Sequence, residues 1–287
     1  MKRLIGILAI LALSLSASAA AAEQFSLSLW YGAGRILPAD LNGFLGDFGR
    51  WMRDIGYSVP ASGLKTLDWS REFGAAVGVP LGDHVSLVAA VGRIGAERLG
   101  NDLDAGVWNG SYTYRRNDRI RSTVARLGVS YAVPLSRALT LRPRISADGY
   151  WSSFQDDGAQ LSTWSGGPAQ TNLEWTADVS AFTLGWSLGA SLDVALGSRL
   201  SLSLDVGWRS AKLTGFKGTY TETENAVAAA PAPFRLFSYE DFEDWIPSTY
   251  RNLNLPGAAG WGIVRNLRDT VLDLTGFTAS AGLKFFF

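Results

Sequence analysis

Strict alternation of apolar and polar residues is the feature that most constrains how this chain folds. In residues 200–208 the apolar positions alternate with small or polar ones: Leu200, Leu202, Leu204, Val206 and Trp208 against Ser201, Ser203, Asp205 and Gly207. Residues 182–196 follow the same pattern. Successive side chains of a β-strand point to opposite faces, so a period of two gives each strand one apolar face and one polar face. The chain is therefore expected to consist of strands that are buried on one side only.

The alternating pattern recurs in eight segments, at about residues 24–36, 71–81, 85–99, 119–135, 139–154, 174–196, 200–216 and 270–287. Three connections between them are tight turns, at 82–84, 136–138 and 197–199, and four are long, at roughly 37–70, 100–118, 155–173 and 217–269. An even number of strands, with short turns at one end and long loops at the other, is typical of a transmembrane barrel. We predict an all-β, antiparallel, up-and-down β-barrel of eight strands, with short periplasmic turns and long extracellular loops.

A soluble eight-stranded barrel with its apolar face inward would alternate in the same way. The polar face distinguishes the two architectures, because it is rich in small residues: Ser26, Ser28, Gly32, Gly34, Gly74, Ala76, Gly78, Gly128, Ser130, Ala132 and Gly282. The interior of an eight-stranded barrel is just wide enough for side chains to fill, so small residues suit the inside. The apolar face is then expected to point outward, toward lipid.

Tryptophan positions give a measure of height along the barrel. Trp208 lies nine residues after its turn, Trp186 eleven before its turn and Trp151 thirteen after its own. A tilted strand climbs roughly 2.5 Å per residue along the barrel axis, which places these side chains about 23–33 Å above the turns. An aromatic girdle is found at this far edge of a ~25 Å apolar band. We predict that Trp151, Trp186 and Trp208 form such a girdle, with core packing as the alternative.

The last strand carries the sharpest motif of the sequence. Every second position up to the terminal residue is apolar: Phe277, Ala279, Ala281, Leu283, Phe285 and Phe287. In this motif the chain resembles bacterial outer-membrane β-barrel proteins, whose final strand ends in the same way. The resemblance implies a place in the bacterial outer membrane, with membrane lipid around the barrel. It also implies that Phe285 and Phe287 act as the signal for the barrel-assembly machinery, but it implies no single activity.

The N-terminus has the layout of a secretory signal peptide. Lys2 and Arg3 precede an apolar run over residues 4–15, and small residues follow at 17–22. A membrane-anchoring helix is the alternative, but the run is shorter than the ~20 residues that cross a bilayer. We predict a signal peptide over residues 1–22 and a single barrel domain over residues 23–287.

Nine charged residues of both signs fall on the inward face: Glu72, Arg126, Arg142, Arg144, Asp148, Asp193, Asp205, Arg209 and Lys284. An isolated buried charge is costly, so in a narrow lumen these groups must pair or remain hydrated. The prediction is a salt-bridged network that stabilises the barrel, with Arg144 as a cationic neighbour of Asp148. The alternative is a polar, porin-like conduit.

Two of the long connections are not simply polar. After Asp40, a good helix N-cap residue, apolar side chains recur at helical spacing: Leu41, Phe44, Leu45, Phe48, Met52 and Ile55. This spacing predicts a short amphipathic helix. The connection 217–269 is rich in aromatic residues, which indicates either a lid that packs on itself or a surface that binds a partner, lipid or a small apolar ligand. The sequence leaves open whether this connection adds strands.

Composition and motifs argue against catalysis. The chain has no Cys, so thiol chemistry and cysteine-ligated metals are excluded. It balances 26 Lys and Arg against 26 Asp and Glu, and thus lacks the net positive charge expected for binding nucleic acid. The single His, His84, lies in a tight turn, and the adjacent Asp156 and Asp157 fit a solvated loop better than a catalytic pair. We find no metal-ligand cluster or cofactor motif.

The sequence therefore predicts a non-catalytic outer-membrane barrel with a structural or surface-interaction role carried by its long extracellular loops. One alternative is a narrow barrel that binds or passes a small apolar molecule, and a lower one is an enzyme that hydrolyses lipid or peptide at the outer membrane. An apolar funnel from the loops into the lumen would favour passage, whereas a capped lumen would favour the surface role.

Overall fold

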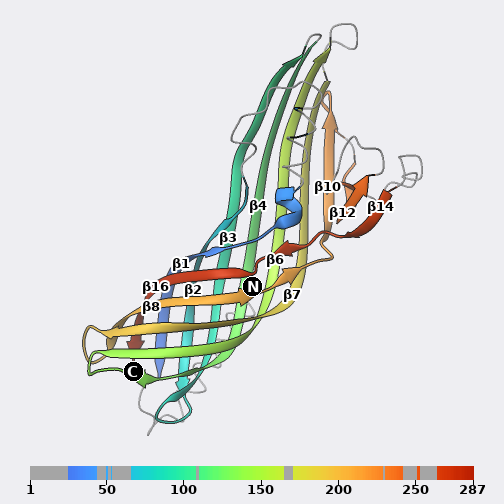
Figure 1. The fold of residues 1–287 in the computed structure, drawn as a ribbon. Helices are drawn as coiled ribbons and strands as arrows, with labels where there is room; N and C mark the ends of the chain where they lie inside the picture. The colour runs from blue at the N-terminus through green and yellow to red at the C-terminus, as the bar shows by residue number, and fades with distance from the viewer. Residues whose placement is uncertain are drawn as a thin grey trace.

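The computed structural model describes residues 25–43, 50, 53, 66–107, 110–164, 171–228, 230–241, 251–252 and 264–287. Within these residues the chain forms a closed antiparallel barrel that continues at one end into a tall, open sheet (Figure 1). The predicted signal peptide, residues 1–22, lies outside the described residues.

Eight strands close the ring of the barrel: β1 (Ser26–Arg35), β2 (Trp69–Pro80), β3 (Val85–Val107), β4 (Gly110–Tyr131), β6 (Leu139–Trp164), β7 (Thr171–Ala195), β8 (Leu200–Ser210) and β16 (Gly276–Phe286). Each pairs antiparallel with its neighbours in chain order, and β16 closes the ring by pairing with both β8 and β1. The predicted eight-stranded up-and-down barrel is confirmed. We call the end that carries the tight turns the turn end, and the opposite end the loop end.

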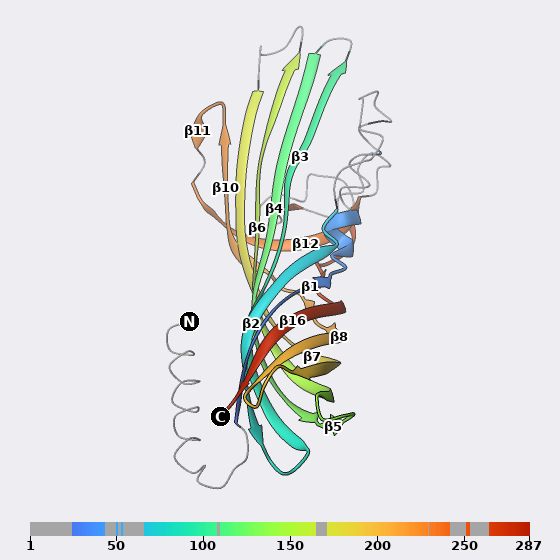
Figure 2. The ribbon, with the colours of Figure 1, turned by 90° about the vertical axis from the view of Figure 1, so that its left-hand side faces the viewer.

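Four of the ring strands run much further than the sequence predicts. The β3–β4 ladder continues to the pair Val107 and Gly110, and the β6–β7 ladder continues to Ser162 and Thr171. Most of residues 100–118 and 155–173, predicted as loops, are therefore paired strand that stands beyond the ring (Figures 1 and 2). Beyond the apolar band no face contacts lipid, so the apolar alternation that predicts a strand stops while the backbone ladder continues.

The last long connection adds strands to this extension and not to the ring. β10 (Lys217–Glu224) pairs with the upper part of β7, and β12 (Ala232–Asp241) pairs with the start of β10. Short strands complete the set: β11 (Val227–Ala228) on β10, β13 (Arg251–Asn252) and β14 (Val264–Asp269) on β12, β9 (Lys212–Leu213) with β15 (Leu272–Asp273), and β5 (Val133–Pro134) on β6. We call the paired strand beyond the ring the extension.

The first long connection is helical at residues 39–43, 50 and 53. The amide of Asn42 donates to the carbonyl of Pro38 at 2.9 Å, so the helix begins before Asp40 and the predicted N-cap role of Asp40 is wrong. The Asp40 carboxylate instead accepts a hydrogen bond from the amide of Val271 at 2.8 Å, which ties the first long connection to the last. Leu41 is buried, and the other apolar positions predicted for this helix lie outside the described residues.

The exterior of the ring is apolar and the interior is crowded. Large apolar side chains are exposed on the outside of every ring strand: Leu29, Phe73, Val85, Leu127, Ile145, Leu184, Leu204, Val206 and Leu283 among them. On the inside, a Cβ at Gly32 would lie 2.2 Å from the carbonyl oxygen of Ala279, so no larger residue fits there without displacing backbone. A soluble barrel with an apolar interior is therefore excluded. No helix among the described residues is long and apolar enough to cross a membrane.

Candidate functional site

The three tryptophans predicted as a girdle lie on the outer face. Trp151 and Trp186 are about half exposed, with 46% and 47% of their surface accessible. Trp151 lies 5.1 Å from the ring of Phe182, and Trp208 makes an edge contact with Phe277 at 4.9 Å. Sequence reasoning missed several aromatic residues that are exposed in the same region of the outer face: Tyr31, Trp69, Phe73, Phe182 and Phe277. All lie on the loop side of the apolar exterior.

The last strand ends at the turn end of the barrel. Phe285 lies opposite Leu27 of β1 and Leu200 of β8. The amide of Phe287 donates to the carbonyl of Phe25 at 2.9 Å, and the rings of these two residues are 6.2 Å apart. The aromatic ring of Phe287 remains largely exposed. The role of Phe285 and Phe287 as an assembly signal stays a prediction.

All nine inward charges predicted for the lumen lie in it, and each takes part in an ion pair. The pairs are Arg209 with Glu72, Arg126 with Asp148 at 3.5 Å, Arg142 with Asp193 at 2.7 Å, Lys284 with Asp193 at 3.1 Å, and Arg144 with Asp205 at 2.8 Å. Arg144 is therefore the ion-pair partner of Asp205, whereas the ion-pair partner of Asp148 is Arg126. We call this set the lumen network.

The Arg209–Glu72 pair is the most deeply buried part of the lumen network. Arg209 has no exposed surface. Its Nε donates to the carbonyl of Leu274 at 2.6 Å, and its Nη2 donates to Ser70 Oγ at 3.2 Å. Ser70 Oγ in turn donates to the carbonyl of Gly34 at 3.0 Å. One guanidinium group thus connects β8 to β2 and to the segment between β15 and β16, and Ser70 extends the connection to β1.

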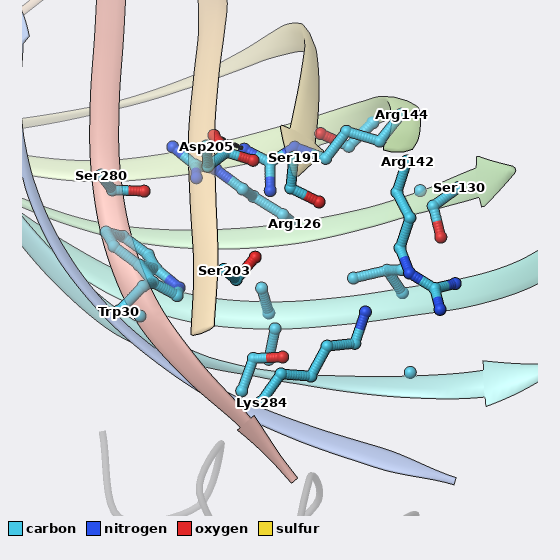
Figure 3. Close-up of a pocket in the computed structure, with 18 of the residues that line it drawn as sticks. Trp30, Arg126, Ser130, Arg142, Arg144, Ser191, Ser203, Asp205, Ser280 and Lys284 are labelled. Carbon is cyan, nitrogen blue, oxygen red and sulfur yellow. Dashed lines mark hydrogen bonds and ion pairs between the residues drawn. The ribbon is translucent and has the colours of Figure 1, made fainter. Parts of the chain in front are cut away.

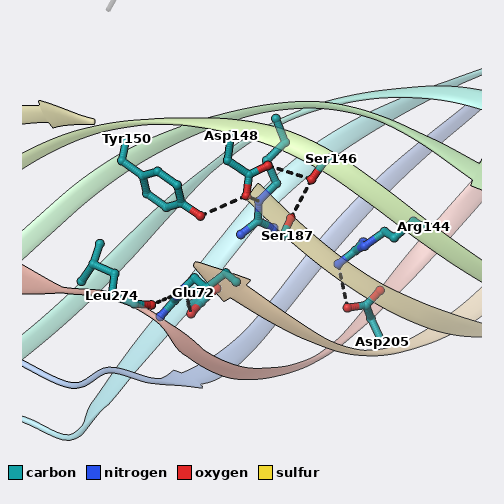
Figure 4. Close-up of polar contacts among 10 residues, drawn as sticks. Glu72, Arg144, Ser146, Asp148, Tyr150, Ser187, Asp205 and Leu274 are labelled. Atoms are coloured by element: carbon teal, nitrogen blue, oxygen red, sulfur yellow. Dashed lines mark hydrogen bonds and ion pairs between the residues drawn. The ribbon is translucent and has the colours of Figure 1, made fainter. Parts of the chain in front are cut away.

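Asp148 is held by neutral donors as well as by Arg126. Ser146 Oγ donates to Asp148 Oδ1 at 2.7 Å, and the Tyr150 hydroxyl donates to Asp148 Oδ2 at 3.0 Å (Figure 4). Ser146 is also within 2.6 Å of Ser187 Oγ on β7. Ser146, Tyr150 and Arg126 together thus contact both oxygens of the Asp148 carboxylate.

Two adjoining cavities lie in and below the lumen network. The inner one, of about 110 Å³, is lined by Trp30 and by the cations Arg126, Arg142, Arg144 and Lys284 (Figure 3). The outer one, of about 470 Å³, lies at the turn end and shares Arg142 and Lys284 with the first. In Figure 3 these two side chains approach the cavity from opposite sides. The lumen is thus hydratable from the turn end as far as the lumen network.

Above the lumen network, toward the loop end, a layer of apolar side chains fills the barrel. Its members are at most 2% exposed: Ile36, Leu41, Leu67, Ile94, Ile120, Val124, Tyr150, Phe154, Leu213, Phe216, Leu272 and Leu274. Ring strands supply the inward positions, and the ends of the first and last long connections supply the rest. We call this layer the apolar plug. One sequence signal could have revealed the apolar plug. Ile94, Ile120 and Phe154 are large apolar residues at inward positions, where the other residues of the strand are small or polar.

A second buried charge cluster lies beyond the apolar plug, on the inward face of the extension. Arg116 Nε is 3.1 Å from Asp118 Oδ1 and 3.0 Å from Asp156 Oδ1, and Arg98 pairs with Asp118. All four residues are at most 3% exposed. We call them the upper cluster. Sequence reasoning missed it because three of its positions, Arg116, Asp118 and Asp156, were assigned to loops.

The upper cluster also corrects the interpretation of the adjacent aspartates. Asp156 points inward into the upper cluster, whereas Asp157 points outward, where its carboxylate is 3.7 Å from Arg119 Nη1. Neighbouring residues of one strand face opposite sides, so the two carboxylates can neither act together nor form a solvated turn.

Two tyrosines share the inward face with the upper cluster. Burial raises the pKa of Tyr114 to about 12, with the positive charge of Arg116 acting against this shift. The ring of Tyr114 lies 5.5 Å from that of Trp175. Burial also raises the pKa of Tyr220, whose hydroxyl donates to Glu222 Oε2 at 2.6 Å. Burial lowers the pKa of the Arg98 guanidinium, and the charge of Asp118 opposes that effect. Both tyrosines are therefore neutral at physiological pH.

The single histidine lies away from these clusters. His84 lines the cavity at the turn end, and its ring is 5.7 Å from that of Tyr131. Within the described ranges, no three His, Asp or Glu side chains are grouped so that they could hold a metal ion.

Comparison with known proteins finds likeness in fold only. No known protein family matches the sequence, and no curated protein sequence matches it. Among solved structures, a major outer membrane protein from Thermus thermophilus is similar at 14% identity and a TM-score of 0.41, over 92% of this chain and 99% of that one. OprG from Pseudomonas aeruginosa has 10% identity and a TM-score of 0.41, over 93% and 96%. Ail of Yersinia pestis has 10% identity and a TM-score of 0.35, over 92% and 99%.

Proposed function

We propose that this chain is a non-catalytic β-barrel of the bacterial outer membrane whose role is interaction at the cell surface. The extension carries this proposal. Four ring strands continue beyond the aromatic residues of the outer face as hydrogen-bonded ladders, and β10 and β12 widen the sheet (Figure 2). A paired sheet holds its side chains in fixed positions, which suits a binding platform better than separate loops would.

The filled interior of the barrel also supports a function at the cell surface and not in the lumen. The apolar plug is packed, and the two described cavities lie on its turn side, where they are lined mainly by small and charged residues. Passage of a small apolar molecule would need an apolar channel through this layer. The charged groups of the lumen network are paired, so they are better suited to holding strands together than to conducting ions.

The experiment that tests the proposal removes the part of the extension that the ring does not need. Replacing residues 219–266 by a tight turn deletes most of β10, all of β11, β12 and β13 and the first half of β14, but leaves every ring pair and the β9–β15 pair in place. We expect a barrel that still migrates faster unheated than boiled in detergent gels. We also expect cells that carry it to lose any adhesion or aggregation conferred by the full chain.

A folded truncation that keeps the surface phenotype would contradict the proposal and move the function into the barrel. A steady pore in planar-bilayer recordings of the full chain would contradict it as well. As a matched control, removing only the β10–β11 turn, residues 225–226, changes the tip of the extension without removing a ring pair. If the wider sheet carries the function, this variant should keep most of the surface phenotype.

A further inference from the structure

Three arginines surround one glycine on the outer face of the barrel. Gly95 of β3 lies directly opposite Arg71 of β2 on one side and Arg121 of β4 on the other. Arg93 lies two residues from Gly95 on β3, so it points to the same face. Neighbouring strands are about 4.8 Å apart, which puts the backbones of Arg71 and Arg121 roughly 10 Å from each other, with Gly95 between them.

The space between these arginines is open. A Cβ at Gly95 would meet no atom within 4 Å. Arg71, Arg93 and Arg121 are all exposed, and none forms an ion pair with a carboxylate in the described part of the chain. We call this place the Gly95 notch. Two guanidinium groups that flank a gap of this width can both reach one small tetrahedral anion placed over the glycine.

Two other outward basic residues, Arg119 and Lys212, do have carboxylate neighbours. Lys212 Nζ is 4.0 Å from Asp273 Oδ2, and Arg119 Nη1 is 3.7 Å from Asp157 Oδ1. The nearest outward carboxylate on β3 is Glu97, which lies directly opposite Arg119. Glu97 also lies two residues from Gly95 on the same face, so the Gly95 notch carries three positive charges against one negative charge and keeps a net positive charge.

The register places the notch at the level of the aromatic residues. Arg93 lies opposite Phe73 on β2 and Thr123 on β4, and Thr123 lies opposite Trp151. Aromatic residues of membrane barrels mark the boundary between acyl chains and headgroups. Directly toward the turn end, the outer face of the same strands is apolar, with Val91 next to Arg93 on β3. A molecule in the notch thus has headgroup surroundings above and acyl-chain surroundings below.

We propose that the Gly95 notch binds the phosphomonoester group of a lipid headgroup in the outer leaflet. The planar guanidinium group donates paired hydrogen bonds to phosphate oxygens, and charge-assisted hydrogen bonds of this kind are the strong ones. A lipid fits better than soluble phosphate because the apolar surface below the notch accommodates the acyl chains of the same molecule. The inference is independent of the surface role proposed above.

The test measures which lipids stay with the purified barrel. The full chain is reconstituted in phosphatidylcholine nanodiscs that contain equal minor fractions of phosphatidic acid, a phosphomonoester, and phosphatidylglycerol, a phosphodiester. Native mass spectrometry then reports the lipids retained on the protein. We expect phosphatidic acid to be enriched over phosphatidylglycerol by about tenfold, because only the monoester presents three free oxygens to the arginines.

Charge and shape are then changed separately. The triple variant R71Q/R93Q/R121Q should lose the enrichment. The variant Gly95→Phe, which keeps all three charges but fills the notch, should lose most of it. Since these positions are exposed and the glycine has free space, both variants should remain folded and heat-modifiable. The matched control, R119Q/K212Q, removes outward basic residues that have carboxylate neighbours and should keep the enrichment.

Three results would overturn the proposal. Equal retention of phosphatidic acid and phosphatidylglycerol would show attraction to surface charge alone. Equal loss in the control variant would show that total positive charge matters and the notch does not. If inorganic phosphate raised the melting temperature of the detergent-solubilised wild type, and the triple variant lost this shift, a soluble anion would be the ligand in place of a lipid.

Discussion

The lumen network and the upper cluster are built from the same groups but are connected differently. Both consist of basic side chains and carboxylates on inward strand positions. The carboxylates are buried in both, whereas four cations of the lumen network are only partly buried: Arg126, Arg142, Arg144 and Lys284. In the lumen network, three of the five ion pairs named above join strands that are not neighbours in the ring, for example Arg209 with Glu72, which are 137 residues apart, and Arg144 with Asp205, which are 61 apart. In the upper cluster, Arg98 and Asp118 are 20 residues apart, and Arg116 and Asp118 only two.

This difference shows what ring closure adds to an ion pair. Inside the closed ring, a side chain faces strands from the other side of the barrel, so a pair such as Arg209 with Glu72 joins distant parts of the chain. On the open extension, a side chain finds its partners on its own strand or on the adjacent ones, β3, β4 and β6. The lumen network therefore bears on the stability of the whole barrel, and the upper cluster on the stability of the extension alone.

The largest effect is expected from Arg209→Ala. This change leaves Glu72 in the barrel without its ion-pair partner, and breaking a fully buried pair costs about 3–5 kcal/mol. The matched variant Arg144→Ala removes a side chain that is 34% exposed and paired with Asp205, so it should cost only about 1 kcal/mol. Urea unfolding of the detergent-solubilised barrel, followed by gel mobility, measures both. Equal losses from the two variants would show that burial does not set the strength of these pairs.

A smaller and local effect is expected from Asp118→Asn. The substitution removes the carboxylate charge that both Arg98 and Arg116 contact in the upper cluster. Amide hydrogen exchange should speed up in the parts of β3 and β4 beyond the ring, because local opening there becomes less costly. Exchange in the ring and the midpoint of global unfolding should stay close to wild type. A global loss as large as that of Arg209→Ala would mean that the extension and the ring unfold as one unit.

The same contrast explains how much the sequence could predict. Within the ring, one face of every strand contacts lipid and the other faces the lumen. Apolar and polar residues therefore alternate along the sequence of each ring strand. This is why the eight ring strands, the inward positions of all nine charges and the outward positions of three tryptophans follow from the sequence. In the extension no face contacts lipid, so residues 100–118 and 155–173 lack this alternation and were predicted as loops.

The sequence could predict which side chains point into the barrel, but not which of them form ion pairs with each other. Which residue meets Arg144 depends on how strands are staggered around the closed ring, and alternation fixes the face of a residue but not this stagger. The sequence suggested Asp148 on the same strand, whereas the ring supplies Asp205 from β8. The apolar plug has the same origin, since Leu67 and Leu272 join it only because the long connections return to the barrel mouth.

The response of stability to high pH measures how well the upper cluster is shielded from water. The pKa of Tyr114 is raised from 10.0 to about 12 by burial. The folded state therefore keeps this proton while the unfolded state loses it. This contribution to stability is complete below pH 10 and is lost as the pH rises toward 12, amounting to about 2–3 kcal/mol at most.

The variant Tyr114→Phe has no phenol to ionise at this position. Its urea midpoint should therefore fall less than that of the wild type between pH about 9 and about 12. In a pH titration followed by tyrosinate absorbance, the folded variant should show one tyrosine fewer than the wild type among those that ionise well above pH 10. Equal losses of stability in the two proteins would mean that water reaches Tyr114 in the folded state. The open sheet would then fail to shield its charges as the closed ring does, and the upper cluster would owe its stability to hydrogen-bond geometry and not to burial.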